Sequence, residues 1–500
     1  METGPDQIRT PSGRAGGKRP GFLTVFPSIM LPMFLAVVDQ TIVATALPAI
    51  AAATGQVERA SWIVVSYLIA STIAAPIYGR LGDASGRRGL MYVALGVFIV
   101  ASLLCAASPT IELLTLARVL QGFGGGGLMT LSQALIGETI PPRERARYQG
   151  YLAAIAVSAN SFGPIAGGYL TEHFGWPSIF LINVPIGLIA VALTARLPHR
   201  TVARDTWQAD PMGLLLVTVF VTATLLALEQ AQHVAMGALP LAGGLFAVGI
   251  VALVLLVRQE LRAPSPLIPI GLLRQPAIWR SDAMAACHGA ALVSLITFLP
   301  IYLEVVRGMS PSTTGLLLVP LTVGIGTGSL VTGRLVSRTG FTMVFPIGGL
   351  VLVTLNLVAL AFWISAVGPT SLGVLLLFNG LFFGTVMGVV QVTVQSAAGP
   401  VRLGEAAASV QFSRSIGAAL GTALVATVLF AVLTLKNLDA ARAFAAMVEH
   451  GRPLAGPMPA EQRAAIQADI AAAFRIAFLT IAAFTTAGFF LALTNPLRRI

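Results

Sequence analysis

The sequence predicts an all-α polytopic membrane protein with 14 transmembrane helices. Of its 500 residues, 56% are hydrophobic and 10% are charged, whereas about 25% of residues in a typical soluble domain are charged. Fourteen apolar stretches run along the chain, each close to the roughly 20 residues that a helix needs to cross a bilayer. They do not alternate apolar and polar residues as barrel strands do, so we expect helices. An internal repeat with an offset of 254 residues predicts two six-helix bundles in parallel pseudo-repeat plus two inserted helices.

The spans follow one another along the chain with mostly short connections. Residues 1–21 are polar, basic and rich in glycine and proline, which predicts a disordered cytoplasmic tail. The first apolar stretch is too long for the core of a signal peptide and has no clear small-residue cleavage site, so we expect it to be retained. The expected spans are 22–44, 60–79, 90–107, 112–134, 149–170, 176–195, 211–229, 238–257, 281–303, 312–333, 343–364, 371–394, 406–433 and 474–495.

Two motifs recur at the offset of 254 residues. Gly-Arg-Leu at 79–81 recurs at 333–335, in each case after the second span of a half. The glycine pair at 163 and 167 recurs at 417 and 421, in the fifth span of each half. The halves therefore repeat in parallel and are related by an axis along the membrane normal.

This repeat divides the chain into domains. The N-terminal six-helix bundle covers 22–195, and the C-terminal bundle covers 281–495 with a long outer loop at 434–473. The segment 196–280 is a linker that carries the two inserted spans. Residues 496–500 form a short cytoplasmic tail.

The distribution of basic residues predicts the orientation and argues against nucleic acid as a partner. An even number of spans places both termini on one side, and that side holds 22 of the 31 Lys and Arg residues against 7 on the other. Basic residues gather on the cytoplasmic side, so we expect both termini in the cytoplasm. Although the net charge is +11, the charges are spread over many short loops and form no stripe for a polyanion.

Several chemical signatures are absent from the sequence. There is no G-x-x-x-x-G-K-[ST] motif and there are only two lysines, so we expect no ATP-driven motor in this chain. H-E-x-x-H and G-x-S-x-G are also missing, which argues against a zinc protease or a nucleophile-elbow hydrolase. Cys105 and Cys287 both fall inside spans and predict neither a disulfide framework nor a metal site. We therefore expect a protein that is not an enzyme and has no metal or cofactor. Transport driven by an ion gradient is the simplest interpretation.

Asp39 and Arg118 are the candidate proton-coupling residues. Asp39 is the only acid deep in an apolar span, and a charge there costs about 2.5–3.5 kcal/mol on insertion scales, so a functional role is the default. Burial favours a protonated carboxyl group and a nearby cation favours an ionised one, so a carboxyl group between the two can take up and release a proton. Arg118 in the fourth span lies at nearly the same depth, and we expect the two residues to couple directly or through water. The alternative is a structural ion pair between the two helices.

A glycine-rich basic turn follows the second span. Its sequence at 79–89 is Gly-Arg-Leu-Gly-Asp-Ala-Ser-Gly-Arg-Arg-Gly, in which glycines permit close backbone approach and the aspartate can face a helix N-terminus. We expect a latch between the bundles that breaks and reforms, and a simple topology-setting basic loop is the alternative. In the second copy Ser337 stands at the place of the aspartate, so that copy looks degenerate. The expected latch residues are Gly79, Asp83, Gly86, Arg87 and Arg88.

Glycines in the fifth span predict a closely packed, bent helix. Small residues permit close approach of helices in a membrane, and proline removes a backbone donor and kinks the helix. Generic close packing is the alternative for any one glycine. The motif consists of Gly163, Pro164, Gly167 and Gly168.

Further polar residues within spans are candidates for a substrate cavity. Arg414, at the repeat equivalent of Asn160, could bind an anionic group, pair with an acid across the cavity, or lie beside Glu405. His288 could titrate, although a hydrogen-bonded structural histidine is the simpler interpretation. The candidates are Gln40, Tyr67, Gln121, Asn160, His288, Gln391, Gln411 and Arg414.

Five motifs in this order resemble the major facilitator superfamily, and within it the fourteen-span drug:proton antiporters. Residues 39–48 resemble the first-helix motif of drug exporters. The turn at 79–89 looks like the signature between the second and third helices, and 114–122 looks like the signature of the fourth helix. Residues 163–168 resemble the antiporter motif of the fifth helix, and 176–187 resemble the sixth-helix stretch of the fourteen-span group.

The resemblance implies a driving force and a class of substrate. It covers nearly the whole chain, although Ala44 stands where these exporters more often have asparagine. It implies a proton-relay role for Asp39 and Arg118, with protons as the coupling ion. It also implies export of amphipathic or hydrophobic drugs or toxic compounds by alternating access across an inner or plasma membrane. We expect the protein to act as a monomer in the lipid bilayer.

Two other functions stay open at this point. The same mechanism could export one dedicated endogenous molecule, such as a lipid, siderophore, peptide or antibiotic. The outer loop at 434–473 could serve that export or dock a periplasmic adaptor. A non-transporting membrane sensor is a different class, but neither tail is long enough to hold a signalling domain.

Overall fold

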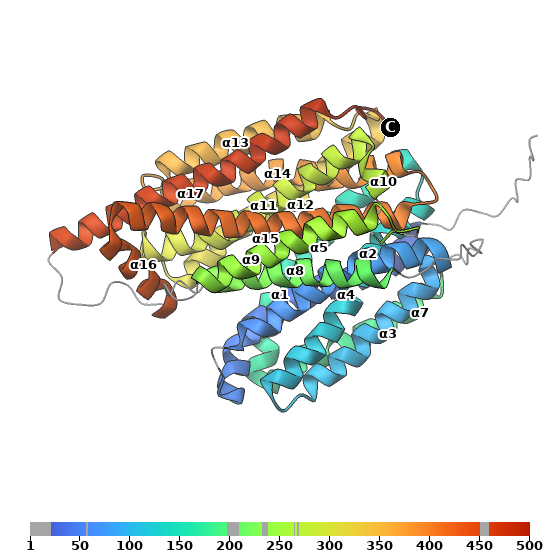
Figure 1. Ribbon diagram of the computed structural model, residues 1–500, viewed down its shortest axis with the longest axis horizontal. Helices are drawn as coiled ribbons and strands as arrows, with labels where there is room; N and C mark the ends of the chain where they lie inside the picture. Colours follow the sequence, from blue (N-terminus) through green and yellow to red (C-terminus); the bar gives the residue numbers. More distant parts are fainter. Residues whose placement is uncertain are drawn as a thin grey trace, which may run out of the picture.

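The computed structural model of the protein consists almost entirely of α-helices (Figure 1). Its described residues contain seventeen helices and no β-strand, and an isolated β-bridge joins Phe341 to Arg499. The expected N-terminal tail at 1–21 lies outside the described residues. The structure describes residues 22–56, 59–197, 210–232, 239–264, 266–267, 270–450 and 460–500.

The first bundle gathers seven helices around one hydrophobic core. Its buried residues extend from Phe26 to Leu197, and Phe98 and Phe180 are among those with no exposed surface. The sixth expected span is interrupted at Ile182, so it forms two helices. The helices of this bundle are α1 Phe22–Thr54, α2 Ser61–Ser85, α3 Arg87–Ala106, α4 Ile111–Thr139, α5 Pro142–Phe174, α6 Ser178–Leu181 and α7 Asn183–Thr194.

The two inserted helices cover a seam between the bundles. They are α8 Pro211–Gln232 and α9 Leu239–Glu260, and they pack on each other around Val217, Phe220 and Leu256. Partly buried residues of α2 and of α15 (Leu403–Lys436) pack against the same cluster. The inserted pair therefore contacts the second helix of one bundle and the fifth helix of the other.

The second bundle repeats the plan of the first. Two clusters of buried apolar residues fill it, one of which also includes Ala146 of the first bundle. A short helix, α10 Ile270–Leu273, precedes the bundle, and α16 Leu438–His450 lies between its last two long helices. The long helices of this bundle are α11 Pro276–Val305, α12 Pro311–Thr339, α13 Val344–Trp363, α14 Pro369–Ala398, α15 and α17 Ala460–Thr494.

Many of these helices can cross a membrane. Among the described residues, ten helices are long and apolar enough to do so by length and composition, and two shorter apolar helices cover Ser178–Thr194 and Pro211–Ala227. The helices α4 and α5 are not among the ten, although they contain 29 and 33 residues. The chain is thus a multi-pass protein, and the count of fourteen spans stays a prediction.

The first helix is longer than the sequence predicts. The expected span ends at 44, but α1 continues to Thr54. Pro48 lies within the helix without ending it, and Ala46 and Ile50 are fully buried in the first bundle. Burial of these apolar residues favours continued helix past the predicted boundary.

The predicted outer loop at 434–473 is also mostly helical. It contains α16 and the start of α17, which begins at Ala460. Phe444 of α16 lies 5.4 Å from Phe430 and 5.7 Å from Phe474 between ring centroids. These aromatic contacts, which stabilise the packing beyond the apolar area they bury, fix α16 against the second bundle.

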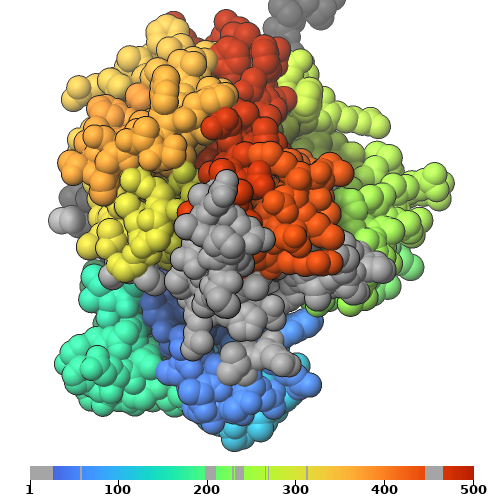
Figure 2. Space-filling model, turned by 90° about the vertical axis from the view of Figure 1, so that its left-hand side faces the viewer, coloured from blue at the N-terminus to red at the C-terminus, as the bar shows by residue number. Residues whose placement is uncertain are grey.

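Contacts between the bundles gather at one end of the molecule. We call this the terminal end, because α1 begins and α17 ends there. At this end Gly79 of α2 faces Gly404 of α15, and Nε2 of Gln395 on α14 donates to the carbonyl oxygen of Gln133 on α4 at 2.9 Å. Toward the opposite end the first bundle diverges from the second (Figure 1). Figure 2 views that opposite end, with the blue and teal first bundle below and the yellow and orange second bundle above.

Helices α5 and α12 form the most extensive of these contacts, and glycines make it possible. A Cβ atom on Gly150 of α5 would lie 2.7 Å from the carbonyl oxygen of Ser329 on α12. In the reverse direction, a Cβ atom on Gly333 of α12 would overlap the carbonyl oxygen of Ala146 on α5. The two backbones therefore approach as closely as small residues allow.

Replacing Gly333 with valine should weaken this closure. The new side chain would overlap Ala146, and overpacking of this kind costs about 1–3 kcal/mol. Ser329 is 6% exposed, so in a chain whose two native cysteines are changed to alanine, a Ser329→Cys reporter should react faster with a water-soluble maleimide. Gly348→Val is the matched control, because a Cβ atom there meets nothing within 4 Å. Equal labelling rates in both variants would contradict the contact.

Candidate functional site

Asp39 lies at the centre of a buried hydrogen-bond network in the first bundle. Its side chain has no exposed surface. Nη1 of Arg118 on α4 donates to Oδ2 of Asp39 at 2.5 Å. Oδ1 accepts hydrogen bonds from Nε2 of Gln121 on α4 and from Nδ2 of Asn183 on α7, both at 2.8 Å. The structure therefore brings the two predicted coupling residues into direct contact, and two neutral amides complete the surroundings of the carboxylate.

Arg118 is held by groups other than the carboxylate as well. Its Nε donates to the carbonyl oxygen of Ile63 on α2 at 3.2 Å, and Nη1 also donates to Oε1 of Gln121 at 2.7 Å. The guanidinium carbon lies 4.3 Å from the ring centroid of Tyr67. Cation–π contacts of this kind are strongest where water is excluded, and Arg118 is 1% exposed.

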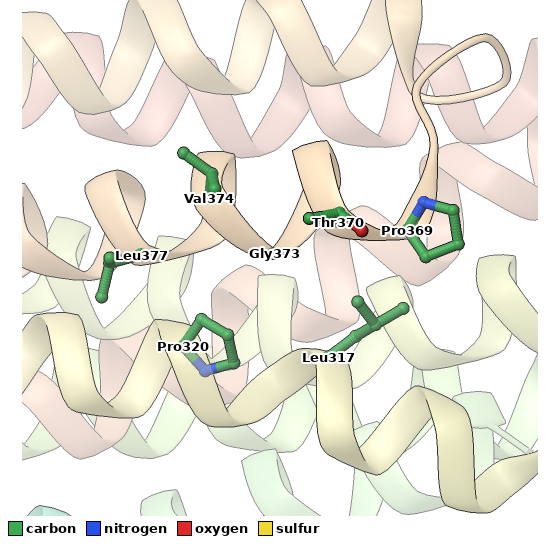
Figure 3. Close-up of a pocket in the computed structure, with 7 residues that line it drawn as sticks. All are labelled: Leu317, Pro320, Pro369, Thr370, Gly373, Val374 and Leu377. Carbon is green, nitrogen blue, oxygen red and sulfur yellow. The ribbon is translucent and has the colours of Figure 1, made fainter.

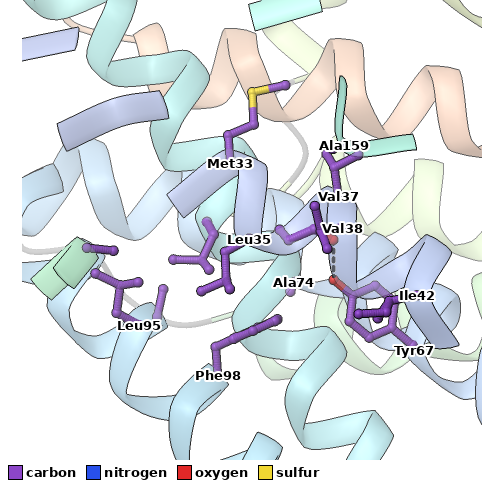
Figure 4. Packing of buried hydrophobic residues seen from close by; sticks show 14 of the residues in the cluster. Met33, Leu35, Val37, Val38, Ile42, Tyr67, Ala74, Leu95, Phe98 and Ala159 are labelled. Atoms are coloured by element: carbon purple, nitrogen blue, oxygen red, sulfur yellow. Dashed lines mark hydrogen bonds between the residues drawn. The ribbon is translucent and has the colours of Figure 1, made fainter. Parts of the chain in front are cut away.

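Tyr67 belongs to the same network and fits closely between α1 and α4. Its hydroxyl donates to the carbonyl oxygen of Ala36 at 3.3 Å, and its ring lies beside Ile42 in the first core (Figure 4). A Cβ atom on Gly122 would lie 2.9 Å from the Cα atom of Tyr67. The glycine in α4 thus lets α2 approach closely enough to place the ring over the guanidinium.

Helix α3 adds a second layer of polar contacts. Oγ of Ser102 accepts from Nε2 of Gln121 at 2.8 Å and from Nδ2 of Asn183 at 3.4 Å. Sγ of Cys105 donates to Oε1 of Gln121 at 3.3 Å. Together α1, α3, α4 and α7 share one polar cluster inside an apolar bundle.

Sequence reasoning missed three members of this cluster as site residues, which are Ser102, Cys105 and Asn183. Asn183 carried a signal, because it is the only amide side chain in the apolar stretch 176–195. Ser102 carried none, since a serine that bonds the preceding turn, here the carbonyl oxygen of Phe98 at 2.8 Å, is ordinary in any apolar helix.

The cluster compensates both buried charges in this conformation. Separating a buried ion pair leaves two uncompensated charges in a low-dielectric interior, which is strongly unfavourable. The carboxylate is paired with one guanidinium and bonded to two amides, so the four helices hold its charge without water.

The predicted cavity residues of the first bundle fall into two groups. Tyr67 and Gln121 are enclosed in the Asp39 network and do not line open space. Gln40 is partly buried, with Nε2 3.9 Å from Sδ of Met129. Asn160 on α5 is exposed. Of these four residues, Gln40 and Asn160 are the ones that a ligand can reach in this conformation.

Two residues of the fifth-helix motif pack α5 directly against the helix of Asp39. A Cβ atom on Gly163 would overlap the side chain of Thr41, and one on Gly167 would lie 2.7 Å from the carbonyl oxygen of Ile42. The other two motif residues do not take part, since Pro164 is exposed and a Cβ atom on Gly168 would meet nothing within 4 Å. The motif thus sets the distance between α5 and α1 through one pair of glycines.

The predicted latch joins the bundles at the terminal end. The carboxylate of Asp83 on α2 accepts hydrogen bonds from the backbone N–H groups of Gly404 at 2.9 Å and Glu405 at 2.9 Å. Asp83 therefore faces the N-terminus of α15, where a negative charge is favourable. Arg80 on α2 pairs with the Glu405 side chain, which is 1% exposed.

Other latch residues organise the turn itself. Arg87 forms ion pairs with Asp83 and with Glu138 of α4. Gly86 has a φ of 97°, a left-handed conformation that L side chains rarely adopt. Arg88 is partly buried, and no hydrogen bond or ion pair to its side chain is found in the described structure. The charged contacts of the latch therefore involve Arg80 and Glu405, which sequence reasoning did not place there, and not Arg88.

The second copy of the turn has a different partner. Gly340 has a φ of 74° and takes the same position between α12 and α13 as Gly86 takes between α2 and α3. Its carbonyl oxygen accepts from the backbone N–H of Ile500 at 2.9 Å, and the N–H of Thr342 donates to the carbonyl oxygen of Arg498 at 3.0 Å. The C-terminal tail thus packs on the second turn.

The polar candidates of the second bundle are more scattered. His288 on α11 is 4% exposed, and its Nε2 lies 3.2 Å from the carbonyl oxygen of Phe383. Gln391 on α14 is 4% exposed, while Gln411 and Arg414 on α15 are partly buried. Glu405 pairs with Arg80, so it is not the partner of Arg414.

A separate apolar groove opens at the surface between α12 and α14. Its volume is about 430 Å³, and Pro320 of α12 lies against Gly373 of α14 along it (Figure 3). Thr370 supplies the polar side chain among its lining residues. No predicted site residue lines this groove, and it offers no charge for proton exchange or for recognition of a charged group.

Two helical bundles are joined at one end, and one of them holds a buried ion pair. The chain matches the Major Facilitator Superfamily over residues 29–422, and it belongs to this family. Relatives of the chain are named as transporters and efflux pumps.

The chain also resembles individual members of the family. It is 33% identical over 400 residues to an uncharacterised MFS-type transporter of Mycobacterium tuberculosis, covering 80% of this chain and 58% of that protein. It is 30% identical over 421 residues to the multidrug transporter protein MdtP of Bacillus subtilis, covering 83% of this chain and 76% of MdtP. The chain thus spans less than two thirds of the length of the mycobacterial relative.

Solved structures share the fold at low sequence identity. The human organic anion transporter MFSD10 has a TM-score of 0.64 and 14% identity, covering 95% of this chain and 100% of that one. The transporter FucP in the outward conformation has a TM-score of 0.61 and 14% identity, covering 94% of this chain and 98% of that one. At this identity the likeness concerns the fold alone.

The ion pair predicts strong coupling between two substitutions. Asp39→Leu or Arg118→Met alone should each destabilise the protein by about 3–5 kcal/mol, because each leaves an uncompensated buried charge. The double variant should lose much less than the sum of the two losses. Thermal unfolding midpoints of the four proteins in one detergent measure this difference, and additive losses would show that the pair is not a unit.

Proposed function

We propose that this protein is a proton-coupled exporter that moves amphipathic or hydrophobic compounds out of the cell by alternating access. The observation that carries the proposal is the enclosed contact between Asp39 and Arg118, at 2.5 Å and with no exposed carboxylate surface. A buried ionisable group in a membrane span is expensive to keep unless it has a function. Homologues named as multidrug transporters support the class of substrate.

The proton and the conformation are coupled through the Asp39 network. Substrate that enters between the bundles shifts α1 or α4 and restores the contact between Arg118 and Asp39. Loss of the substrate allows the two side chains to separate again. The carboxyl group then takes up a proton from one compartment or releases it to the other, as the guanidinium leaves or returns. Because α1 packs on α5 through Gly163 and Gly167, movement of α1 is transmitted to α5 and to its contact with α12.

The latch stabilises the state that is closed to the cytoplasm. With both termini in the cytoplasm, as the basic residues predict, the terminal end is the cytoplasmic end. Asp83 bonded to the start of α15 then closes the protein to the cytoplasm while the opposite end diverges. Release of the substrate to the outside would be followed by opening of the latch and rearrangement to an inward-facing state.

The proton gradient is large enough for this task. A single proton falling through about 150 mV supplies roughly 3.5 kcal/mol. That free energy sustains a substrate gradient of about a few hundredfold at one proton per substrate. No ATP-binding motif is needed for concentrative export.

The proposal includes several features beyond the chemistry of the ion pair. The chain spans the inner or plasma membrane fourteen times, and the inserted pair α8 and α9 preserves the parallel relation of the two bundles. Protons are the coupling ion, and the protein functions as a monomer without a cofactor.

Gradient-driven efflux from proteoliposomes tests this function. Three dansyl compounds with a sulfonate, a hydroxyl or a trimethylammonium head group serve as probes, since none of the three heads titrates near neutral pH. The wild type should transport at least one of them when a pH gradient is imposed, and Asp39→Asn should not. Asparagine keeps an oxygen that can accept from Arg118, so this variant should stay folded.

Asp469→Asn is the matched control for loss of a carboxylate. Asp469 pairs with Lys436 at 2.9 Å outside the network of Asp39, so its variant should transport at the wild-type rate. Undiminished gradient-driven efflux by Asp39→Asn would remove Asp39 from the coupling mechanism. Absence of transport of all three probes by the wild type would count against export of amphipathic compounds.

A further inference from the structure

Arg414 lies in the interior of the second bundle, and no described residue pairs with its side chain. It is partly buried, and its Nε is a buried atom with no hydrogen-bond partner in the described structure. Within the described structure its two terminal nitrogens form no hydrogen bond, and they are not fully buried, so they reach accessible space. It lies eleven residues beyond the start of α15, about 17 Å along the helix, and thus near the middle of the bilayer.

Arg414 lies on a helix that packs against both bundles. Gly417 and Gly421, one and two turns further along, pack against α11. Gly404 and Ala408, toward the start of the helix, pack against Gly79 of α2 in the first bundle. A Cβ atom on Gly289 of α11 would overlap the carbonyl oxygen of Arg414, so Arg414 lies on the side of α15 that faces α11.

No acid pairs with Arg414 in the part of the chain that the structure describes. Glu405 pairs with Arg80, and Asp39 pairs with Arg118. Asp282 on α11 accepts from Oγ of Ser409 at 3.4 Å, more than one turn of α15 closer to the terminal end than Arg414. A buried guanidinium normally pairs with a carboxylate or phosphate, so the missing partner calls for an explanation.

Other polar atoms on the adjoining helices also lack partners. They are buried, and in the described structure no hydrogen bond reaches them, whereas the large majority of buried polar groups are hydrogen-bonded. His288 precedes Gly289, which packs against the backbone of Arg414, and Asn379 lies one helical turn from Phe383, which contacts His288. The atoms are Nδ1 of His288, Nδ2 and Oδ1 of Asn379, and Nε2 of Gln391.

We propose that Arg414 binds the anionic head group of the transported molecule. The substrate class is then an amphipathic organic anion, with a carboxylate or sulfonate head, and this inference rests on the export function proposed above. A guanidinium offers two parallel N–H donors that match the two oxygens of such a head. Because no acid among the described residues pairs with Arg414, and Asp282 lies more than one turn of α15 closer to the terminal end, the fixed charge at the depth of Arg414 is positive and favours an anion over a cation.

Binding of matched probes to the purified protein tests the proposal. Dansyl-taurine carries a sulfonate, and its trimethylammonium counterpart has the same fluorophore and linker with a fixed positive charge. Wild-type protein in phosphatidylcholine nanodiscs should bind dansyl-taurine more tightly than the cation, as measured by dansyl fluorescence. Arg414→Gln should bind dansyl-taurine on the order of tenfold to a hundredfold more weakly, the range expected for loss of a hydrogen bond to a charged group. Arg414→Lys keeps the charge but loses the two parallel donors, so its affinity should lie between those of the wild type and Arg414→Gln.

Two further variants separate the site from general charge effects. Arg338→Gln removes an exposed arginine from the last turn of α12 and should bind dansyl-taurine like the wild type. Asp282→Asn removes the nearby carboxylate that has an unpaired oxygen and should leave binding unchanged or tighter. Equal affinity of wild type and Arg414→Gln, or preference of the wild type for the cation, would overturn the proposal. Loss of binding in Asp282→Asn would overturn it too.

An anionic lipid offers the same chemistry as the probe, so the nanodisc composition is varied. Addition of phosphatidylglycerol should leave the affinity of the wild type for dansyl-taurine unchanged. Displacement of the probe by this lipid would assign Arg414 to a lipid head group and overturn the assignment to substrate. Binding is measured without a pH gradient, so it does not depend on transport. If the protein bound dansyl-taurine through Arg414 but showed no gradient-driven efflux, the exporter proposal would be wrong and the anion site would still be supported.

Discussion

The contact between the carboxylate of Asp39 and the guanidinium of Arg118 constrains how the helices of the first bundle pack. Both charges are removed from water, so their mutual attraction has to be completed by hydrogen bonds to avoid a large desolvation penalty. Gln121 and Asn183 supply these bonds, and the helices α1, α3, α4 and α7 must hold their positions for the cluster to form. Glycines in α4 and α5 permit the necessary approach, since side chains there would overlap Tyr67 and Thr41. The polar cluster and the close helix packing are thus two aspects of one arrangement.

The two bundles repeat one another in fold but not in chemistry. The first bundle holds the ion pair, whereas the second holds Arg414, which pairs with no acid among the described residues. In the proposed exchange, a proton on Asp39 and an anion at Arg414 would involve different bundles, and the contacts between the bundles would have to link them. Those contacts lie at the terminal end, through the α5–α12 glycines and through Asp83 on the start of α15. A rigid-body movement about this end would change both sites together, which is the physical requirement for exchange of one ligand against another.

Much of this architecture could be predicted from the sequence, because hydrophobic length and charge obey strong physical rules. The sequence alone shows the apolar spans, the repeat at 79–81 and 333–335, and the isolated acid at Asp39. The membership in a transporter family was anticipated by the same motifs. Partners fixed by tertiary packing could not be predicted, and Glu405 is an example, because it lies 325 residues from Arg80 in the sequence. Tyr67 and Gln121 were expected beside substrate for the same reason, since nothing in one span indicates which side faces the interior of its own bundle.

The central claim is that the carboxyl group of Asp39 takes up or releases a proton as the transporter binds its substrate. Proton release by the purified protein in weakly buffered detergent solution, followed with a pH-indicator dye while a transported compound is added, measures this directly. The account predicts that the wild type releases protons on addition of the compound and that Asp39→Asn, which still binds it, releases none. Equal proton release by the two proteins would show that another group carries the proton.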